Sequence, residues 1–233
     1  MKRCLFLVEG PFDRQRLAAL KGLFDPGKLE IIPFGTDVLS SASYAEEAEK
    51  EIAALLAKDK LYRITDFDVF VQVCDTDGCF IDDSLVMEGT GHILYAVDHI
   101  EAMDPQSVRD DHRLKAKTIR ALLEKGAIRL YYNSSNIDHA FDGKQNPSYS
   151  FKKHAAIAMY KNTRDDHEAL VRMLFESERS HSRSYRESWD YIQIGANSLM
   201  ATSNLFFFLL DYYEYLTEGA KALVDACWEN KAS

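Results

Sequence analysis

The sequence predicts an α/β fold, in which a mostly parallel four-stranded sheet carries helices on both faces and precedes a helical C-terminal region. Short apolar runs alternate with amphipathic segments over residues 1–135, which is typical of parallel strands joined by helical crossovers. Strand signals then fade, and residues 136–233 have mainly helical periodicity. The chain of 233 residues is 46% apolar, so it can bury a sizeable core.

Four apolar runs are the strand candidates. Each is short enough for a buried strand, and Gly10-Pro11 and Gly35 close the first two. The third is rich in Val and Phe, as strands commonly are. The runs are residues 3–8 (RCLFLV), 29–34 (LEIIPF), 67–74 (FDVFVQVC) and 127–132 (AIRLYY).

Helices are expected between and after these strands. In the first of them, apolar residues recur at three- and four-residue intervals, which leaves Arg14, Arg16 and Lys21 for a solvent-facing side. In the sheet region the expected helices span residues 12–24, 43–58, 91–103 and 113–125. In the C-terminal region they span residues 151–161, 164–180, 184–193 and 197–228.

One C-terminal stretch is too apolar to face water. Residues 203–216 (SNLFFFLLDYYEYL) include three consecutive phenylalanines. Such a segment needs burial against the sheet region or against a second chain. The sequence therefore leaves two roles open for residues 136–233, which are completing the core and mediating homo-oligomerisation.

The net charge, the N-terminal residues and the cysteines limit the classes of protein to which this chain can belong. A formal net charge of −9 argues against a surface devoted to nucleic acid, because such binding depends on phosphate neutralisation by Lys and Arg, but a local basic groove remains open. The apolar run before Glu9 is too short for a signal peptide, and no uncharged apolar stretch reaches about 18 residues. Four scattered cysteines suit reduced thiols. We therefore expect a cytoplasmic protein without a membrane partner.

Acidic residues follow two of the predicted strands. Glu9 comes directly after the first strand, and Asp75 and Asp77 follow the third. If these strands are neighbours, their carboxyl ends share one edge of the sheet and the three acids converge there. In an extended segment, residues 75 and 77 point the same way, and Gly78 allows a sharp turn behind them. Packed carboxylates are tolerable mainly around a cation, and hard oxygen ligands favour Mg²⁺ or Mn²⁺.

The same residues resemble a known family. V-E-G-x-x-D at residues 8–13, opening a helix after an N-terminal strand, and D-x-D at residues 75–77, after a later strand, resemble the Toprim domain. That domain is shared by type IA and type II topoisomerases, bacterial primases, small ribosomal RNA maturases, recombination mediators and OLD-like nucleases. The resemblance covers roughly residues 1–135.

The resemblance implies Mg²⁺-dependent cleavage of phosphodiesters. Glu9 corresponds to the family glutamate that acts as general acid/base or metal ligand, and Asp13 to the second acid of that motif. Asp75 and Asp77 correspond to the metal-binding pair, with Asp75 also in the catalytic role, and Asp83 is a candidate further ligand. The chain has no P-loop of the G-x-x-x-x-G-K-[ST] type. A stand-alone nuclease, similar to the Toprim part of OLD-like and phage-defence effectors, is the expectation.

Basic residues in the C-terminal region are candidates for contacting nucleic acid. Lys152 and Lys153 could reach a scissile phosphate, with Asp142 as a later acid. A second basic run has Tyr185 and Trp189 available for base stacking. That run consists of Arg179, His181, Arg183 and Arg186.

Two alternatives use the same acids. The stretch VCDTDGCFID also resembles the first motif of haloacid-dehalogenase-type phosphatases, in which Asp75 would be the nucleophile and Asp77 the general acid. That alternative leaves Glu9 unexplained. The other is a non-catalytic Toprim-like interaction module. The acidic net charge also fits a nuclease that depends on an ATPase or another activating partner to engage nucleic acid.

Overall fold

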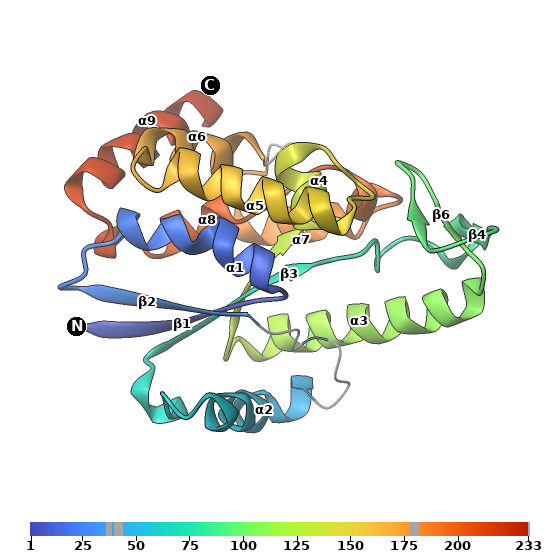
Figure 1. Cartoon of the computed structure of the whole chain (residues 1–233), viewed down its shortest axis with the longest axis horizontal. Helices are drawn as coiled ribbons and strands as arrows, with labels where there is room; N and C mark the ends of the chain where they lie inside the picture. Colours follow the sequence, from blue (N-terminus) through green and yellow to red (C-terminus); the bar gives the residue numbers. More distant parts are fainter. Residues whose placement is uncertain (36–38, 40–43, 178–181, 233) are drawn as a thin grey trace.

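Four parallel strands form the centre of the molecule in this computed structural model, which describes residues 1–35, 39, 44–177 and 182–232 (Figure 1). The strands lie in the order β2-β1-β3-β7, so β1 and β3 are neighbours. Their bounds are Lys2–Val8 for β1, Leu29–Gly35 for β2, Val69–Asp75 for β3 and Arg129–Asn133 for β7. The predicted four-stranded parallel sheet is therefore confirmed.

Each central strand contributes side chains to two apolar cores, because successive side chains point to opposite faces of a sheet. In β1, Phe6 and Val8 face one side while Leu5 and Leu7 face the other. We call the first side the α8 core and the second the α3 core, after the helices that cover them. All four side chains are buried, which explains why β1 is a continuous apolar run and not an alternating one.

Helices α2 (Tyr44–Asp59) and α3 (Pro105–Lys125) cover one face of the sheet (Figure 1). Their buried side chains join the α3 core. The expected helix over residues 113–125 is too short, because α3 begins at Pro105. The reason is local: the Asp104 side chain accepts a hydrogen bond from the Ser107 N–H at 3.1 Å, and proline is favoured at the first helical position.

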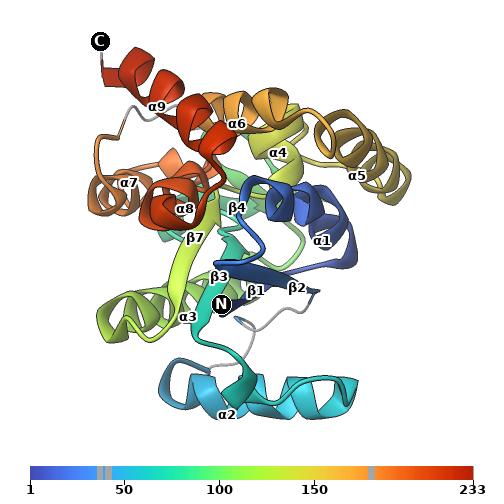
Figure 2. The same ribbon diagram turned by 90° about the vertical axis from the view of Figure 1, so that its left-hand side faces the viewer.

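The other face carries α1 (Pro11–Leu17) and most of the C-terminal helices (Figure 2), whereas the C-terminal residues Trp189 and Ile192 join the α3 core. The expected solvent side of α1 is wrong at Arg16, which is fully buried and ion-paired with Asp138 and with Asp142. The helix also ends early, and a 3₁₀ helix, Ala18–Leu23, follows it. The C-terminal helices are α4 (Ile137–Asp142), α5 (Tyr149–Thr163), α6 (His167–Glu176), α7 (Tyr185–Ile192), α8 (Phe206–Asp211) and α9 (Glu218–Ala232).

The apolar stretch at residues 203–216 packs against the sheet, the first of its two expected roles. Phe206, Phe207 and Phe208 are buried within the α8 core. The Phe208 ring lies 5.1 Å from that of Phe6 in β1 and 5.7 Å from that of Tyr131 in β7. The expected helix over residues 197–228 is divided by short 3₁₀ turns into α8 and α9. The two predicted regions thus share one core.

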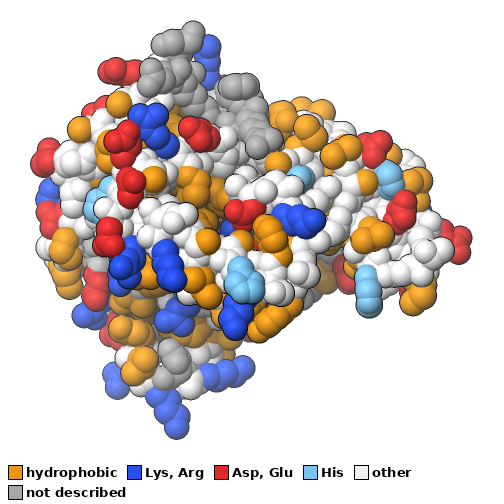
Figure 3. All heavy atoms as spheres, turned by 45° about the horizontal axis from the view of Figure 1, so that its top comes forward, with side chains coloured by type: hydrophobic (Ala, Val, Ile, Leu, Met, Phe, Trp, Pro, Cys, Tyr) orange, Lys and Arg blue, Asp and Glu red, His pale blue; other side chains and the backbone are white. Residues whose placement is uncertain are grey.

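The expected helix over residues 91–103 is wrong. This segment contributes to a small sheet of order β4-β6-β5, with β4 at Val86–Glu88, β5 at Leu94–Tyr95 and β6 at Ile100–Ala102. Gly89 and Gly91 disfavour a helix there, and the β4–β6 and β5–β6 ladders satisfy the backbone instead. We call residues 86–102 the lobe, since it projects beyond the carboxyl ends of the central strands (Figures 1 and 3).

Among the described helices, none combines the length and the apolar character that a bilayer-spanning segment needs.

Replacing Phe208 should test how far the C-terminal region supports the sheet. We expect Phe208→Ala to lower the free energy of unfolding by about 3–5 kcal/mol, because it opens a cavity among three buried aromatic rings. Urea denaturation followed by circular dichroism measures this change. Leu61→Ala, at an exposed position, is the control. Equal, small losses in both variants would mean that α8 does not stabilise the sheet.

Candidate acidic site

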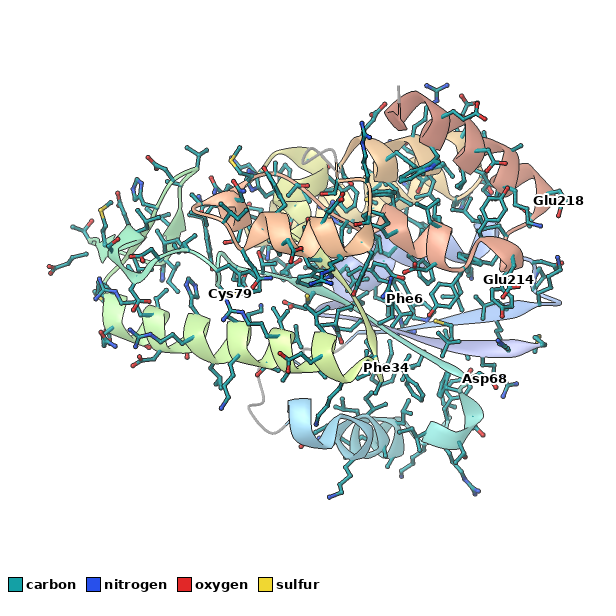
Figure 4. The ribbon with its side chains drawn as sticks, turned by 180° about the vertical axis from the view of Figure 1, so that it is seen from behind. Phe6, Phe34, Asp68, Cys79, Glu214 and Glu218 are labelled. Atoms are coloured by element: carbon teal, nitrogen blue, oxygen red, sulfur yellow. The ribbon has the colours of Figure 1, made fainter. Side chains whose placement is uncertain are left out.

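The acids at the ends of β1 and β3 meet as expected. The two strands pair in parallel with Val8 opposite Val73, so Glu9 and Asp75 lie at the same edge of the sheet. The Asp75 backbone N–H donates a hydrogen bond to Glu9 Oε1 at 3.0 Å. Cys79, labelled in Figure 4, marks this end of the sheet, and Asp68 marks the opposite end. Strand pairing alone therefore places the Glu9 carboxylate beside Asp75.

The turn after β3 differs from the extended segment that the sequence analysis assumed. Asp77 has a φ of 49° and Gly78 a φ of 71°, so the chain turns at Asp77 itself. A Cβ at Gly78 would lie 2.6 Å from Leu199 Cδ2, and the positive φ disfavours other residues, so both features favour glycine there. The Asp77 N–H donates to the Ser135 carbonyl at 2.8 Å, so the loop after β7 fixes the turn.

A lysine that the sequence analysis did not select lies between the acids. Lys115, on α3, places its Nζ 2.5 Å from Asp77 Oδ2 and 3.4 Å from Glu9 Oε1. Burial lowers the pKa of Lys115, but the charges of Asp77 and Glu9 more than offset it and hold that pKa well above its usual range. The ammonium is therefore charged at neutral pH and partly neutralises the acidic group.

The surroundings of Asp75 disfavour the charged form of its carboxyl group. Burial raises its pKa well above the usual range, and the charges of Glu9, Asp13 and Asp77 raise it further. Asn133, at the end of β7, donates from Nδ2 to Asp75 Oδ1 at 3.2 Å. Without a further positive charge, the Asp75 carboxyl thus keeps its proton to a higher pH than an exposed aspartate does.

Asp13 caps the start of α1 and also adds negative charge near the acidic site. Its Oδ2 accepts a hydrogen bond from the Gly10 N–H at 3.0 Å, which caps the start of α1. Burial raises the pKa of Asp13 to about 6, against an opposing effect of Lys152 and a reinforcing one of Asp138. Its charge also acts on Asp75. Asp13 and Lys152 therefore lie close enough to interact with each other, as a site built from both would need.

Asp83 does not join the other acids. It pairs with Arg113 and lines a different hollow, together with Phe80 and Gln193. Within the described residues, no hydrogen bond or ion pair links Asp83 to Glu9, Asp75 or Asp77, so its proposed role as a further metal ligand has no geometric support.

The basic candidates also separate from one another. Lys153 is exposed on α5, while Arg183 and Arg186 are exposed near the start of α7, where Arg186 lies 3.9 Å from Asp190. Arg179 and His181 fall outside the described residues. The expected stacking platform is wrong, because Trp189 is buried against Tyr132, with ring centroids 5.0 Å apart. Tyr185 is half-buried and donates its hydroxyl to the Leu130 carbonyl at 2.7 Å.

The donor set suits a divalent ion chemically, since carboxylate oxygens are ligands that Mg²⁺ and Mn²⁺ accept. In the part of the chain that the structure describes, no three His, Cys, Asp or Glu side chains form a ready-made metal-binding group. The Lys115 ammonium lies between Glu9 and Asp77 instead. An ion that contacts both carboxylates therefore requires this ammonium to move aside.

The spacing of residues in the sequence indicates that Lys115 lies on the inward side of its helix. On α3 it lies three residues after His112 and four before Ile119, and both of those side chains are buried. A lysine at these intervals lies on the inward side of the helix, where a lone charge needs an acidic partner. The buried Arg16 had a weaker signal, because its partners Asp138 and Asp142 are distant in sequence.

No protein-family model, curated protein or solved structure matches this chain. The assignment of a function therefore depends on the geometry of the site.

Removing the Asp75 charge should stabilise the fold. The folded chain keeps the Asp75 proton to a higher pH than the unfolded chain, whose aspartates have a pKa of about 3.9, so the wild type loses stability as pH rises between these values. In EDTA we expect Asp75→Asn to raise Tm at pH 8 by about 2–4 °C per kcal/mol recovered, and by less at pH 5.

Differential scanning fluorimetry measures both values. Asp165→Asn, an exposed acid beside Arg164, is the control and should leave Tm unchanged. A lower Tm for Asp75→Asn at pH 8 would contradict the raised pKa.

Proposed function

We propose that this protein is a Toprim-like nuclease that hydrolyses phosphodiester bonds of DNA or RNA with Mg²⁺ or Mn²⁺. The observation that carries the proposal is the meeting of Glu9 with Asp75 and Asp77 across two neighbouring parallel strands. A surface made only for binding has no need to assemble like charges, which here raise the pKa of Asp75. The Toprim-like order of the two acidic motifs along the chain supports the same reaction class.

In this proposal each residue has a distinct role. Asp75, Asp77 and Glu9 would hold the divalent ion, which when bound would stabilise negative charge on the phosphate oxygens. Glu9 would also exchange a proton with the attacking water or the leaving oxygen. Lys115, released from Glu9 and Asp77 by the incoming ion, would face the phosphate as a fixed positive charge. Asp13 and Lys152 would complete the electrostatic surroundings.

The phosphatase alternative gains one feature from the structure and loses another. Lys115 supplies a lysine next to the D-x-D turn, which that chemistry needs. However, the acidic pair Asp110 and Asp111 lies on α3 and not at a strand end, and Asp166 caps α6. Glu9 is left without a role. The position of Glu9 therefore favours phosphodiester cleavage over an aspartyl-phosphate mechanism.

Cleavage assays test the proposal directly. Purified protein should cut at least one of plasmid DNA, single-stranded DNA and tRNA with Mg²⁺ or Mn²⁺, and EDTA should abolish the reaction. Glu9→Ala should lower the rate by about 100-fold or more, since it removes both a metal ligand and a proton carrier.

A phosphomonoester included in the same assay separates the alternatives. Its turnover by the wild type, retained in Glu9→Ala, would favour the phosphatase. Failure to cut any of these substrates would favour the interaction module.

A second experiment tests Lys115, with Lys117 on the same helix as the matched control. We expect Lys115→Ala to lower the cleavage rate by about 100-fold, because an oriented positive charge in a water-poor site stabilises the transition state strongly. Lys117→Ala removes an exposed lysine from the same helix and should leave the rate unchanged. Equal rates for the two variants, measured at saturating Mg²⁺, would contradict a catalytic role for Lys115.

A further inference from the structure

A small pocket opens directly beside the acidic site. Its volume is about 170 Å³, and it lies where the lobe faces α3. Asp77 and Lys115 of the acidic site form part of its lining, so a molecule in the pocket lies next to the proposed reaction centre. The remaining lining residues are Ile93, Tyr95, Val108, Asp111 and His112.

The lobe side of this pocket is held firmly. The Asn146 side chain accepts a hydrogen bond from the Tyr95 N–H at 2.9 Å and donates one to the Tyr95 carbonyl at 2.8 Å. Gln145 Nε2 donates to the Ala96 carbonyl at 2.7 Å. Three hydrogen bonds from the loop between α4 and α5 thus fix the backbone of Tyr95 and Ala96.

Two polar groups of the pocket residues have no partner among the described residues, but only the Asp111 carboxylate is accessible to a ligand. His112 is only 8% exposed, and its Nδ1 has no hydrogen-bond partner among the described residues. Such an unsatisfied buried nitrogen costs about 1–3 kcal/mol. Asp111 is exposed and, in the described part of the chain, makes no ion pair or hydrogen bond. A bound ligand that offers hydrogen-bond donors can pair with the Asp111 carboxylate, whereas His112 Nδ1 has almost no accessible surface through which to meet a ligand.

The charge and shape of the lining limit the class of ligand that the pocket can bind. Asp77 and Asp111 outweigh the single Lys115 ammonium, so the pocket disfavours an anionic group. Val108, Ile93 and the Tyr95 ring supply apolar surface to either side of these charges. A small, neutral, planar ring with N–H donors on its edge fits this combination, and in nucleic acids the base is such a group.

We propose that the pocket binds one nucleobase with an exocyclic amino group, next to the phosphodiester that the acidic site would cleave. The Asp111 carboxylate accepts the amino hydrogens, while the apolar side chains contact the ring. The inference rests on the proposed nuclease function and adds a preference for unpaired adenine, cytosine or guanine over thymine or uracil. A base can enter only when it is unstacked, so single-stranded or distorted substrates should be favoured.

Binding in EDTA, where metal-dependent cleavage is absent, tests the pocket separately. Fluorescence anisotropy of labelled DNA octamers, dC8, dA8, dT8 and an abasic octamer, gives the four affinities. We expect dC8 and dA8 to bind at least about fivefold more tightly than dT8 and the abasic octamer. Asp111→Ala should remove this difference, because alanine has no side-chain oxygen to accept the amino hydrogens. Asp110→Ala, at the adjacent exposed acid that pairs with Arg113, should retain it.

Ile93→Trp gives an independent check, since it fills the pocket from a half-exposed position. It should weaken dC8 to the level of the abasic octamer. Equal binding of all four octamers to the wild type, no binding of any, or equal effects of Asp110→Ala and Asp111→Ala would overturn the pocket proposal. Base-independent binding together with metal-dependent cleavage would refute the pocket alone. Base-dependent binding without cleavage under any metal would refute the nuclease proposal alone.

Discussion

The packing of several carboxylates at one sheet edge is the constraint on which this structure depends. Parallel pairing of β1 with β3 places Glu9 against the Asp75 backbone, and the turn after β3 adds Asp77. Like charges this close resist ionising together, so the edge needs positive charge. The Lys115 ammonium provides it, and the helix α3 that carries Lys115 is itself anchored in the α3 core. The site is therefore stable only as a combination of acids and cation.

The C-terminal region is part of this arrangement and not an appendage. Besides filling the α8 core, it supports the D-x-D turn directly. The Ser198 carbonyl accepts hydrogen bonds from the Ser135 N–H at 2.9 Å and from the Thr76 hydroxyl at 3.3 Å. Leu199 packs closely against Gly78. Segments more than 120 residues apart in the chain thus fix one turn, which explains how Asp77 holds a left-handed backbone conformation.

A second charged network lies behind the first. Arg16 is buried with Asp138 and Asp142, and it joins α1 to α4. Asp13, one turn before Arg16 on α1, feels the charges of Asp138 and Lys152 as well as those of the acidic site. Burying an arginine is favourable only with well-placed acidic partners. The position of α1, and with it the Glu9–Asp13 segment, is consequently set by ion pairs as well as by apolar packing.

The sequence by itself determined the four strands, most of the helices and the acids at the strand ends, because buried strands and capped helices leave local patterns. It predicted the convergence of Glu9, Asp75 and Asp77, since parallel strands present their carboxyl ends at one edge. Only the tertiary structure decided that Lys115 lies between them, that Asp83 lies elsewhere and that residues 91–103 form strands in a projecting lobe. These outcomes depend on partners distant in sequence, such as Arg113 for Asp83 and Asn146 for Tyr95, and no local pattern specifies a partner of that kind.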